Sequence, residues 1–264
     1  MNLKVALINC SASKSHPPGP GLKWKKGMTL DKWTKTWFSQ AELHPVRTLY
    51  SGYNFQQQIE LCKLYSIDCF VISAGAGLLD LEDKIPSYDS SFIEQNGPDV
   101  SEWVRLPMGN LEQLPDECEI ISFSPPQYQL AIKSDPFFDQ IKDRLVVGSN
   151  SPLSNVAGRV LTISNRAAKV LKCSQSHLSV KLLKLYLEEG EDGFIRIEKE
   201  AILLPNKRTT RKVTNDELIE IVREFMELGS LTKIVRAIRD TTDIAASYER
   251  IRDARNHLMN DYDL

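Results

Sequence analysis

The chain has 264 residues, of which 42% are hydrophobic and 26% are charged, and its formal net charge at pH 7 is −2. This composition is typical of a globular protein with a sizeable core and excludes collagen-like and compositionally disordered chains. The apolar runs are far shorter than the roughly 20 residues that cross a bilayer, and the first residues lack the basic and apolar regions of a secretory signal. We therefore expect a cytoplasmic protein without a membrane partner.

The charge is distributed unevenly along the chain. Residues 1–50 carry eight Lys or Arg and two Asp or Glu, whereas residues 51–150 carry six and sixteen. A basic region on a weakly acidic chain permits a polyanion to bind on one side. The five cysteines are scattered without a CxxC pair, which argues against a disulfide framework, a zinc site or an iron–sulfur cluster. We expect no metal and no cofactor.

The first predicted element is a strand that ends in a polar loop. Val5 to Ile8 form an apolar run without polar alternation, which is typical of a short strand buried on both faces. Asn9 follows, and the next residues offer hydroxyl, backbone N–H and ammonium groups suited to a phosphate or a polar base. The alternative is that the serines only form turns. The expected pocket residues in this loop are Ser11, Ser13, Lys14 and His16.

Residues 21–38 alternate lysines with aromatic side chains. Lysines pair with phosphates and aromatic rings stack on bases, so this segment is a candidate DNA contact. Residues 30–38 are predicted to form an amphipathic helix, with Trp33 and Trp37 spaced i, i+4 to pack against the sheet. The residues expected to contact DNA are Trp24, Lys25 and Lys26.

Short β-branched runs that break into Ser, Gly, Asn or Pro recur at residues 68–77, 118–127, 144–155 and 159–165. Helical patterns occur at residues 53–65, 100–114 and 127–133. This alternation predicts an α/β fold with a mostly parallel sheet flanked by helices, in which the polar ends of the strands share one edge. The residues expected there are Ser73, Tyr88, Ser124, Gln127, Asn150 and Ser151.

The character of the sequence changes after residue 165. One or two helices closed by Gly190 are expected, then a short hairpin over residues 193–204 and a basic linker marked by Pro205. We place the domain boundary after residue 195, with an α/β domain at 1–195 and a small all-α unit at 196–264.

Three helices are expected in this unit, with Gly229 and Ser230 between the first two and a tight turn before the third. This spacing is typical of a helix-turn-helix, although such units also serve as packing or dimerisation modules. Arginines on the last helix would be available to base edges or phosphates. The residues expected to contact DNA are Lys207, Arg208, Arg211, Lys212, Ser247, Tyr248, Arg250 and Arg252.

Two pairs of short motifs resemble known families. The loops at residues 8–11 and 150–154 resemble the first and last signature loops of the uracil-DNA glycosylase superfamily. The blocks at residues 8–15 and 71–89 also resemble a little-characterised bacterial and phage family, related to domains found beside tRNA base-exchange enzymes. The whole arrangement is similar to that of bacterial anti-phage DNA glycosylases, which remove glucosylated hydroxymethylcytosine from phage DNA.

These resemblances imply a three-layer catalytic domain and a double-stranded DNA substrate with modified bases. The implied reaction is hydrolysis of the N-glycosidic bond, which leaves an abasic site as an anti-phage defence, with no obligatory protein partner. The superfamily resemblance places Asn9 at the asparagine that positions the attacking water.

The chemistry requires particular groups. Cleavage of an N-glycosidic bond builds positive charge on the sugar and negative charge on the leaving base. Asn9 can orient a water but cannot take its proton, so a carboxylate is expected to stabilise the cation or accept the proton, with Asp89 preferred over Asp80 or Asp83. His16 is a candidate donor to the leaving base. A duplex base must flip out to reach the pocket, and the candidates for stacking on it are Tyr88, Phe123 and Tyr128.

Two other classes of function remain open. The first is a hydrolase or base exchanger of free nucleosides or nucleotides, which would use the same pocket without DNA contacts. The second is a regulator whose α/β domain senses a ligand while the C-terminal helices bind an operator.

Overall fold

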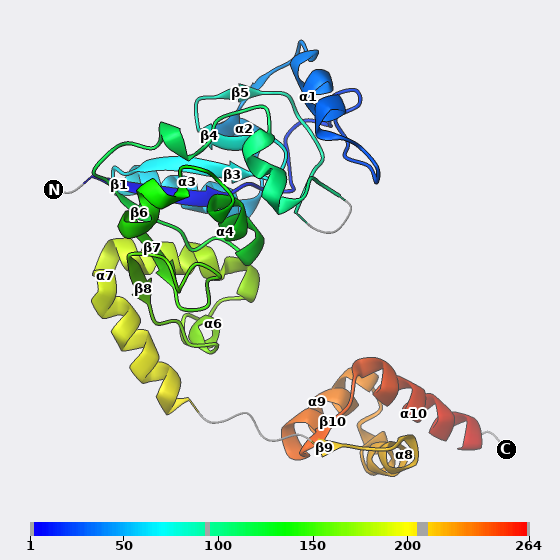
Figure 1. The fold of residues 1–264 in the computed structure, drawn as a ribbon. Helices are drawn as coiled ribbons and strands as arrows, with labels where there is room; N and C mark the ends of the chain where they lie inside the picture. Colours follow the sequence, from blue (N-terminus) through cyan, green and yellow to red (C-terminus); the bar gives the residue numbers. More distant parts are fainter. Residues whose placement is uncertain (1–2, 93–95, 205–210, 263–264) are drawn as a thin grey trace. The chain divides into compact units, whose positions relative to one another are not determined.

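A computed structural model describes residues 3–92, 96–204 and 211–262. The chain divides into two compact units, residues 1–203 (unit 1) and residues 204–264 (unit 2), and each has a hydrophobic core of its own (Figure 1). The division falls after residue 203 rather than after residue 195 because a long helix of unit 1, α7 (Leu178–Leu203), runs through the position expected from sequence.

Unit 1 is built on a six-stranded sheet with the order β4-β3-β1-β6-β7-β8. β4 is antiparallel to β3, and all other neighbours are parallel. The expected α/β class with a mostly parallel sheet is therefore confirmed. The strands are β1 (Lys4–Asn9), β3 (Asp68–Ser73), β4 (Gly77–Asp80), β6 (Glu119–Ile121), β7 (Leu145–Gly148) and β8 (Arg159–Leu161).

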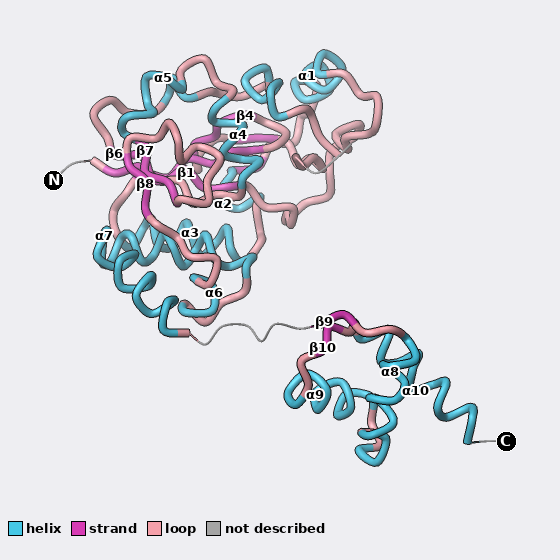
Figure 2. Tube along the Cα trace, turned by 60° about the horizontal axis from the view of Figure 1, so that its bottom comes forward, coloured by secondary structure: helices cyan, strands magenta, loops and turns pink. Residues whose placement is uncertain are grey.

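Helices flank this sheet. α3 (Tyr53–Leu64) and α7 lie on one side of it, and α5 (Phe138–Ile141) lies on the other (Figure 2). α4 (Pro126–Lys133) packs against the 3-10 helix η1 (Val100–Arg105). The remaining elements are α1 (Leu30–Phe38), α2 (Val46–Leu49), α6 (Ala167–Val170), η2 (Leu111–Gln113), η3 (Lys142–Arg144), η4 (Gln175–His177), and the antiparallel pair β2 (His44–Pro45) and β5 (Lys84–Ile85).

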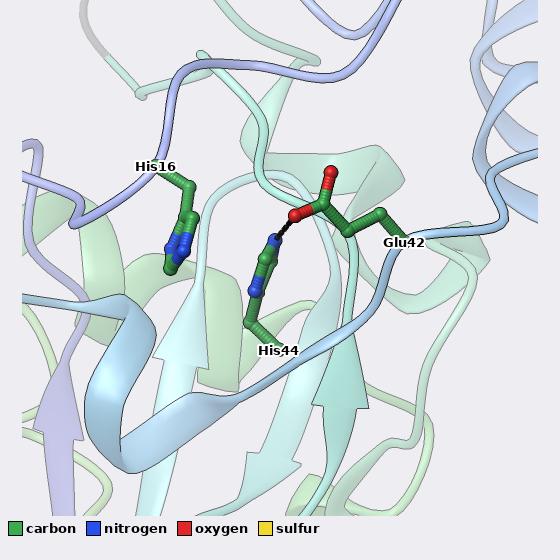
Figure 3. Close-up of side chains that lie close together, drawn as sticks. All are labelled: His16, Glu42 and His44. Carbon is green, nitrogen blue, oxygen red and sulfur yellow. Dashed lines mark ion pairs between the residues drawn. The ribbon is translucent and has the colours of Figure 1, made fainter.

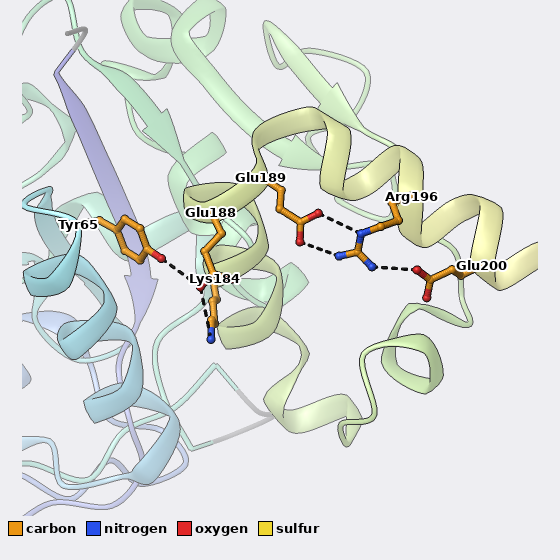
Figure 4. A network of polar contacts seen from close by, with 6 residues as sticks. All are labelled: Tyr65, Lys184, Glu188, Glu189, Arg196 and Glu200. Atoms are coloured by element: carbon orange, nitrogen blue, oxygen red, sulfur yellow. Dashed lines mark hydrogen bonds and ion pairs between the residues drawn. The ribbon is translucent and has the colours of Figure 1, made fainter.

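The hairpin expected after Gly190 is wrong, because residues 193–203 are helical. Gly190 has φ +60° and non-helical backbone angles, so it ends the first helical segment of α7 as expected, and a second helical segment follows across a kink. Arg196 spans the interruption: its guanidinium donates to both carboxylate oxygens of Glu189 at 3.0 and 2.7 Å and to Glu200 at 2.9 Å (Figure 4). A bidentate pair of this kind fixes orientation as well as distance. Tyr65 donates to Glu188 at 3.1 Å and so connects the end of α3 to α7.

The described part of unit 2 contains three helices, α8 (Asn215–Glu224), α9 (Leu231–Thr241) and α10 (Tyr248–Tyr262), with the 3-10 turn η5 (Met226–Leu228) after the first. The hydroxyls of Thr214 and Ser230 cap α8 and α9 by accepting backbone N–H groups. The unit is not purely helical, since β9 (Arg211–Lys212) pairs in parallel with β10 (Ile244–Ala245). Among the described residues, none of the helices is both long enough and apolar enough to cross a membrane.

Candidate functional site

The polar ends of the parallel strands meet along one edge of the sheet. β1, β3, β6, β7 and β8 all run in the same direction, so the residues that follow them emerge together. The polar side chains at this edge form two groups. One surrounds a pocket beyond β6 and β7, and the other is a buried cluster beyond β1 and β3.

The β6–β7 pocket has a volume of about 230 Å³. Its walls come from the loops after β6, β7 and β8, from α4, and from the start of α7. It is lined by Phe123, Ser124, Pro125, Pro126, Gln129, Gly148, Asn150, Ser151, Ile163, Gln175, Ser176, Leu178, Ser179 and Leu182. A Cβ atom at Gly148 would lie 2.1 Å from Ile163 Cδ1 and 2.8 Å from Asn150 Oδ1, so any larger residue here would force these two side chains to move.

A chain of hydrogen bonds holds the polar side of this pocket. The Ser151 hydroxyl donates to Gln129 Oε1, and Gln129 Nε2 donates to the carbonyl of Ser122 at 3.2 Å. Ser151 Oγ also accepts the N–H of Leu153 at 2.9 Å. The side chains of Gln129 and Ser151 are therefore fixed by their partners, and preorganised donors and acceptors of this kind suit recognition of a polar ligand.

Two buried polar atoms beside the pocket have no hydrogen-bond partner within the described parts of the chain. These are Asn54 Oδ1 and Ser122 Oγ. Asn54 is held by its other amide atom, since Nδ2 donates to the carbonyl of the pocket residue Ser176 at 2.7 Å. Buried polar groups are normally paired, so these atoms are candidates for contact with a ligand or a bound water.

The second group, which we call the tyrosine cluster, consists of Lys14, Tyr50, Ser73 and Tyr88. The Tyr88 hydroxyl lies 2.6 Å from that of Tyr50 and 2.5 Å from Ser73 Oγ. Lys14 Nζ lies 4.2 Å from the centre of the Tyr88 ring and 5.4 Å from that of Tyr50. This is the geometry of a cation–π contact.

Burial dominates the electrostatics of the tyrosine cluster. Desolvation lowers the pKa of Lys14, while the nearby Cys10 and Asp89 oppose that shift. Desolvation raises the pKa of both Tyr50 and Tyr88 above the ordinary value for tyrosine. The two phenols therefore remain protonated and act as hydrogen-bond donors at neutral pH.

Replacing Tyr88 by phenylalanine should destabilise unit 1 by about 1–3 kcal/mol, because the hydroxyls of Tyr50 and Ser73 lose a buried partner. The measurement is the free energy of unfolding from urea titration. Tyr248→Phe is the control, since Tyr248 is 44% exposed in unit 2, and it should change stability by less than about 0.5 kcal/mol. Equal effects of the two substitutions would contradict the assignment of the cluster as a stabilising network.

The structure brings together only part of the set of pocket residues expected from sequence. Ser124, Asn150 and Ser151 line the β6–β7 pocket. The other expected residues do not line it. Gln127 is exposed on the outside of α4, and Gln129 takes the inward position two residues later. Ser11, Ser13, Lys14, His16, Ser73 and Tyr88 lie instead beyond β1 and β3.

Asn9 and Asp89, the expected catalytic residues, also lie outside the lining of this pocket. The amide nitrogen of Asn9 donates to the carbonyl of Cys10 at 3.0 Å, and Cys10 Sγ contacts the Tyr128 hydroxyl on α4 at 3.7 Å. Asp89 is exposed, and its carboxylate lies 3.5 Å from Lys23 Nζ. Asn9 is therefore on the strand next to β6, whereas Asp89 lies beside Lys23 and Trp24.

Two of the expected aromatic contacts are buried. Trp24 is 8% exposed and packs on Trp33 with ring centres 5.2 Å apart, and Tyr88 is 1% exposed. Neither side chain presents a free ring face to a base. Lys25 and Lys26 are exposed. Trp33 and Trp37 are buried on α1, as the helical spacing predicts.

Some of the DNA-contact residues expected in unit 2 already have partners within the protein, and others are exposed. Arg250 donates to the carbonyl of Val213 and to Asn215 Oδ1, both at 2.8 Å. These hydrogen bonds connect α10 to the start of α8. Arg211 pairs with Glu217 and Asp243, Arg252 pairs with Asp253, and the hydroxyl of Ser247 accepts the N–H of Arg250. Lys212 and Tyr248 are exposed. Lys207 and Arg208 lie outside the described residues.

No protein-family model, curated protein or solved structure matches the chain. The site must therefore be interpreted from its own geometry. Sequence reasoning missed Gln129, Asn54 and the residues at the start of α7. The one available signal was the helical phase of residues 126–133, which places Gln129 with Ile132 on the buried side of α4.

Proposed function

We propose that the protein is a DNA glycosylase that holds an extruded, modified base in the β6–β7 pocket and hydrolyses its N-glycosidic bond. The observation that carries the proposal is the pocket itself, which lies at the carboxyl edge of a parallel sheet and offers Ser124, Gln129, Asn150 and Ser151 beside an aromatic ring, Phe123. Ligands of open α/β sheets bind at this edge. Flipped bases are recognised by hydrogen bonds and by stacking.

The size of the pocket favours a compact ligand. Pockets for small molecules commonly measure about 300–1,000 Å³, and this one measures about 230 Å³. A single base is a better match for that volume than a whole nucleotide. A glucosyl group on hydroxymethylcytosine would then extend toward the polar rim, where Gln175, Ser176 and Ser179 lie. Glucosylated hydroxymethylcytosine in phage DNA is the substrate that we propose.

Exposed cations are available for the DNA backbone. Lys25 and Lys26 in unit 1, and Lys212 in unit 2, are exposed. Lysines in such positions neutralise phosphates and make binding dependent on salt. The two units would each contribute part of the contact with duplex DNA.

The reacting groups that we propose are Asn9 and Asp89. Asn9 would orient the attacking water, because an amide offers both a donor and an acceptor but no basic site. Asp89 lies outside the pocket lining, where its exposed carboxylate is 3.5 Å from Lys23 Nζ, and it would stabilise the positive charge on the sugar once the bound strand brings the sugar toward it. The order of motifs that resembles the uracil-DNA glycosylase superfamily supports this assignment of Asn9.

The direct test uses duplexes of one sequence with cytosine, hydroxymethylcytosine or glucosylated hydroxymethylcytosine at a single position. Alkali-labile abasic sites should form fastest with the glucosylated base. Asn150→Ala should lower kcat/KM about tenfold, which corresponds to the loss of about one hydrogen bond. Asn165→Ala is the matched control, since Asn165 is also exposed but does not line the pocket. Absence of abasic sites from all three duplexes would refute the proposal.

A further inference from the structure

We propose that His16, Glu42 and His44 form a binding site for a divalent transition-metal ion, with zinc as the best match. Each residue offers one ligand atom, and the three atoms lie within 4.8 Å of one another. Figure 3 shows the two imidazole rings side by side and the Glu42 carboxylate directed at His44. The site is distinct from the β6–β7 pocket, and it does not depend on the proposed glycosylase activity.

The distances are close to those that a metal requires. His44 Nε2 lies 3.5 Å from Glu42 Oε1, and zinc bonds of about 2.0–2.2 Å in a tetrahedral site place neighbouring ligand atoms roughly 3.4 Å apart. The ring centres of His16 and His44 are 3.8 Å apart, and the rings are stacked with an angle of 18° between their planes. Since a nitrogen lone pair lies in the plane of its ring, the exposed His16 ring must turn before both lone pairs can face the same ion. Because the side chain of Glu42 is 80% exposed, a change of rotamer can bring its carboxylate closer to an ion bound by the two histidines. Two imidazoles and a carboxylate are ligands that zinc prefers.

The hydrogen bonds of Ser15 select the tautomer of His16 that binds a metal. The single hydroxyl proton of Ser15 is donated to the carbonyl of Thr48 at 2.9 Å. Toward His16 Nδ1, which lies 2.9 Å away, the same oxygen must therefore accept. Nδ1 carries the proton, and the lone pair of Nε2 is left free. A second partner that orients a histidine in this way is a regular feature of metal sites.

The backbone holds the two segments of the site in place. The N–H of Ser15 donates to the carbonyl of Leu49 at 2.8 Å, and the Ser87 hydroxyl donates to the carbonyl of His16 at 2.7 Å. His44 belongs to β2, which pairs with β5. The ligands are thus carried by anchored segments, which lowers the cost of ordering them around an ion.

Three protein ligands leave a coordination position for water or a small anion. Sites of this composition are open, unlike the four-ligand sites that only stabilise a fold. Glu42 and His44 also line a pocket of about 450 Å³ together with Gln40 and Ser87. A water or small anion bound to the metal could occupy this pocket. The spacing of the cysteines predicts no metal site in this sequence. That argument does not apply to the proposed site, because its ligands are two histidines and a glutamate.

The test is isothermal titration of the full chain, first treated with a chelator, with ZnCl₂ and with CoCl₂. We expect one ion per chain with a dissociation constant below about 10 μM. Glu42→Gln should weaken binding at least tenfold without risk to folding, because the side chain is exposed, and His16→Ala should weaken it further. His177→Ala is the control: its imidazole bonds to Ser174 and lies edge-on to the Tyr53 ring, and it is not part of the cluster.

Three outcomes would overturn the proposal. The first is that neither zinc nor cobalt binds to the protein. The second is binding that survives the double substitution of His16 and Glu42. The third is a thiolate charge-transfer band in the cobalt spectrum, which would assign the ion to cysteines instead.

Discussion

Replacing Asn9 by alanine should lower the rate of base release by about two to four orders of magnitude while leaving the affinity for duplex DNA within about twofold. Asn9 ends β1, and its amide nitrogen is fixed by the carbonyl of Cys10 at 3.0 Å. That bond determines where the amide oxygen points. If the side chain orients the attacking water, its loss affects kcat and not binding. Single-turnover kinetics and a DNA-binding titration separate the two quantities.

Asn9→Asp distinguishes orientation of water from a structural role. Aspartate keeps the size of asparagine and accepts a hydrogen bond, and it can also take the proton of the water. We expect this variant to keep most of the activity and to acquire an acidic limb in its pH–rate profile, with activity falling as pH drops through the carboxyl pKa of about 4. A purely structural asparagine would produce no such limb. Full activity in Asn9→Ala would remove Asn9 from the mechanism.

The backbone of this fold was predictable because its strands are short, apolar and buried on both faces. Val5 to Ile8 are at most 1% exposed, and the β-branched runs at β3, β6 and β7 are buried to a similar degree. A run of this kind has no stable place outside the centre of a sheet covered by helices. The helix at residues 30–38 was equally predictable, since Leu30, Trp33 and Trp37 repeat at helical spacing.

The candidate site was only partly predictable. The sequence indicates which residues follow the strands at the carboxyl edge of the sheet, but not where along that edge each of them lies. The strand order places β3 and β1 at one end of that edge and β7 and β8 at the other. Residues expected in one pocket are therefore divided between the β6–β7 pocket and the tyrosine cluster. Nothing in the local sequence states this order, because it follows from pairings between distant segments.

Other differences come from contacts between distant segments. Trp24 is flanked by lysines, which indicates exposure, yet it is buried against Trp33. Residues 193–203 contain Ile and Phe at spacing that suits a strand, but Arg196 bridges Glu189 and Glu200 along a helix. His16 and His44 come together only because β2 pairs with β5 and Ser87 holds the loop. Propensity is a weak guide where such contacts decide the outcome.

Replacing Trp33 by alanine should produce the largest loss of stability, about 3–5 kcal/mol. The side chain is fully buried, and its indole N–H donates to the carbonyl of Gly75 at 2.8 Å. Its ring contacts those of Trp24, Trp37 and Tyr88 at 5.2, 6.2 and 6.1 Å between centres. The substitution leaves a cavity among these rings and an unpaired carbonyl. For a domain of this size, the melting temperature should fall by about 10 °C or more.

The four tryptophans of the chain all lie in unit 1, so tryptophan fluorescence follows the unfolding of this unit alone. Trp33→Phe keeps most of the buried ring and should cost less than the alanine variant. Phe38→Ala on the same helix is the matched control, since Phe38 is 67% exposed, and it should change stability by less than about 0.5 kcal/mol. Because Gly75 and Tyr88 both contact Trp33, the alanine variant should also loosen the loop after β3, which contains Gly75, and the segment that carries Tyr88 of the tyrosine cluster. A Trp33→Ala protein as stable as Phe38→Ala would show that the aromatic packing on α1 does not hold that loop in place.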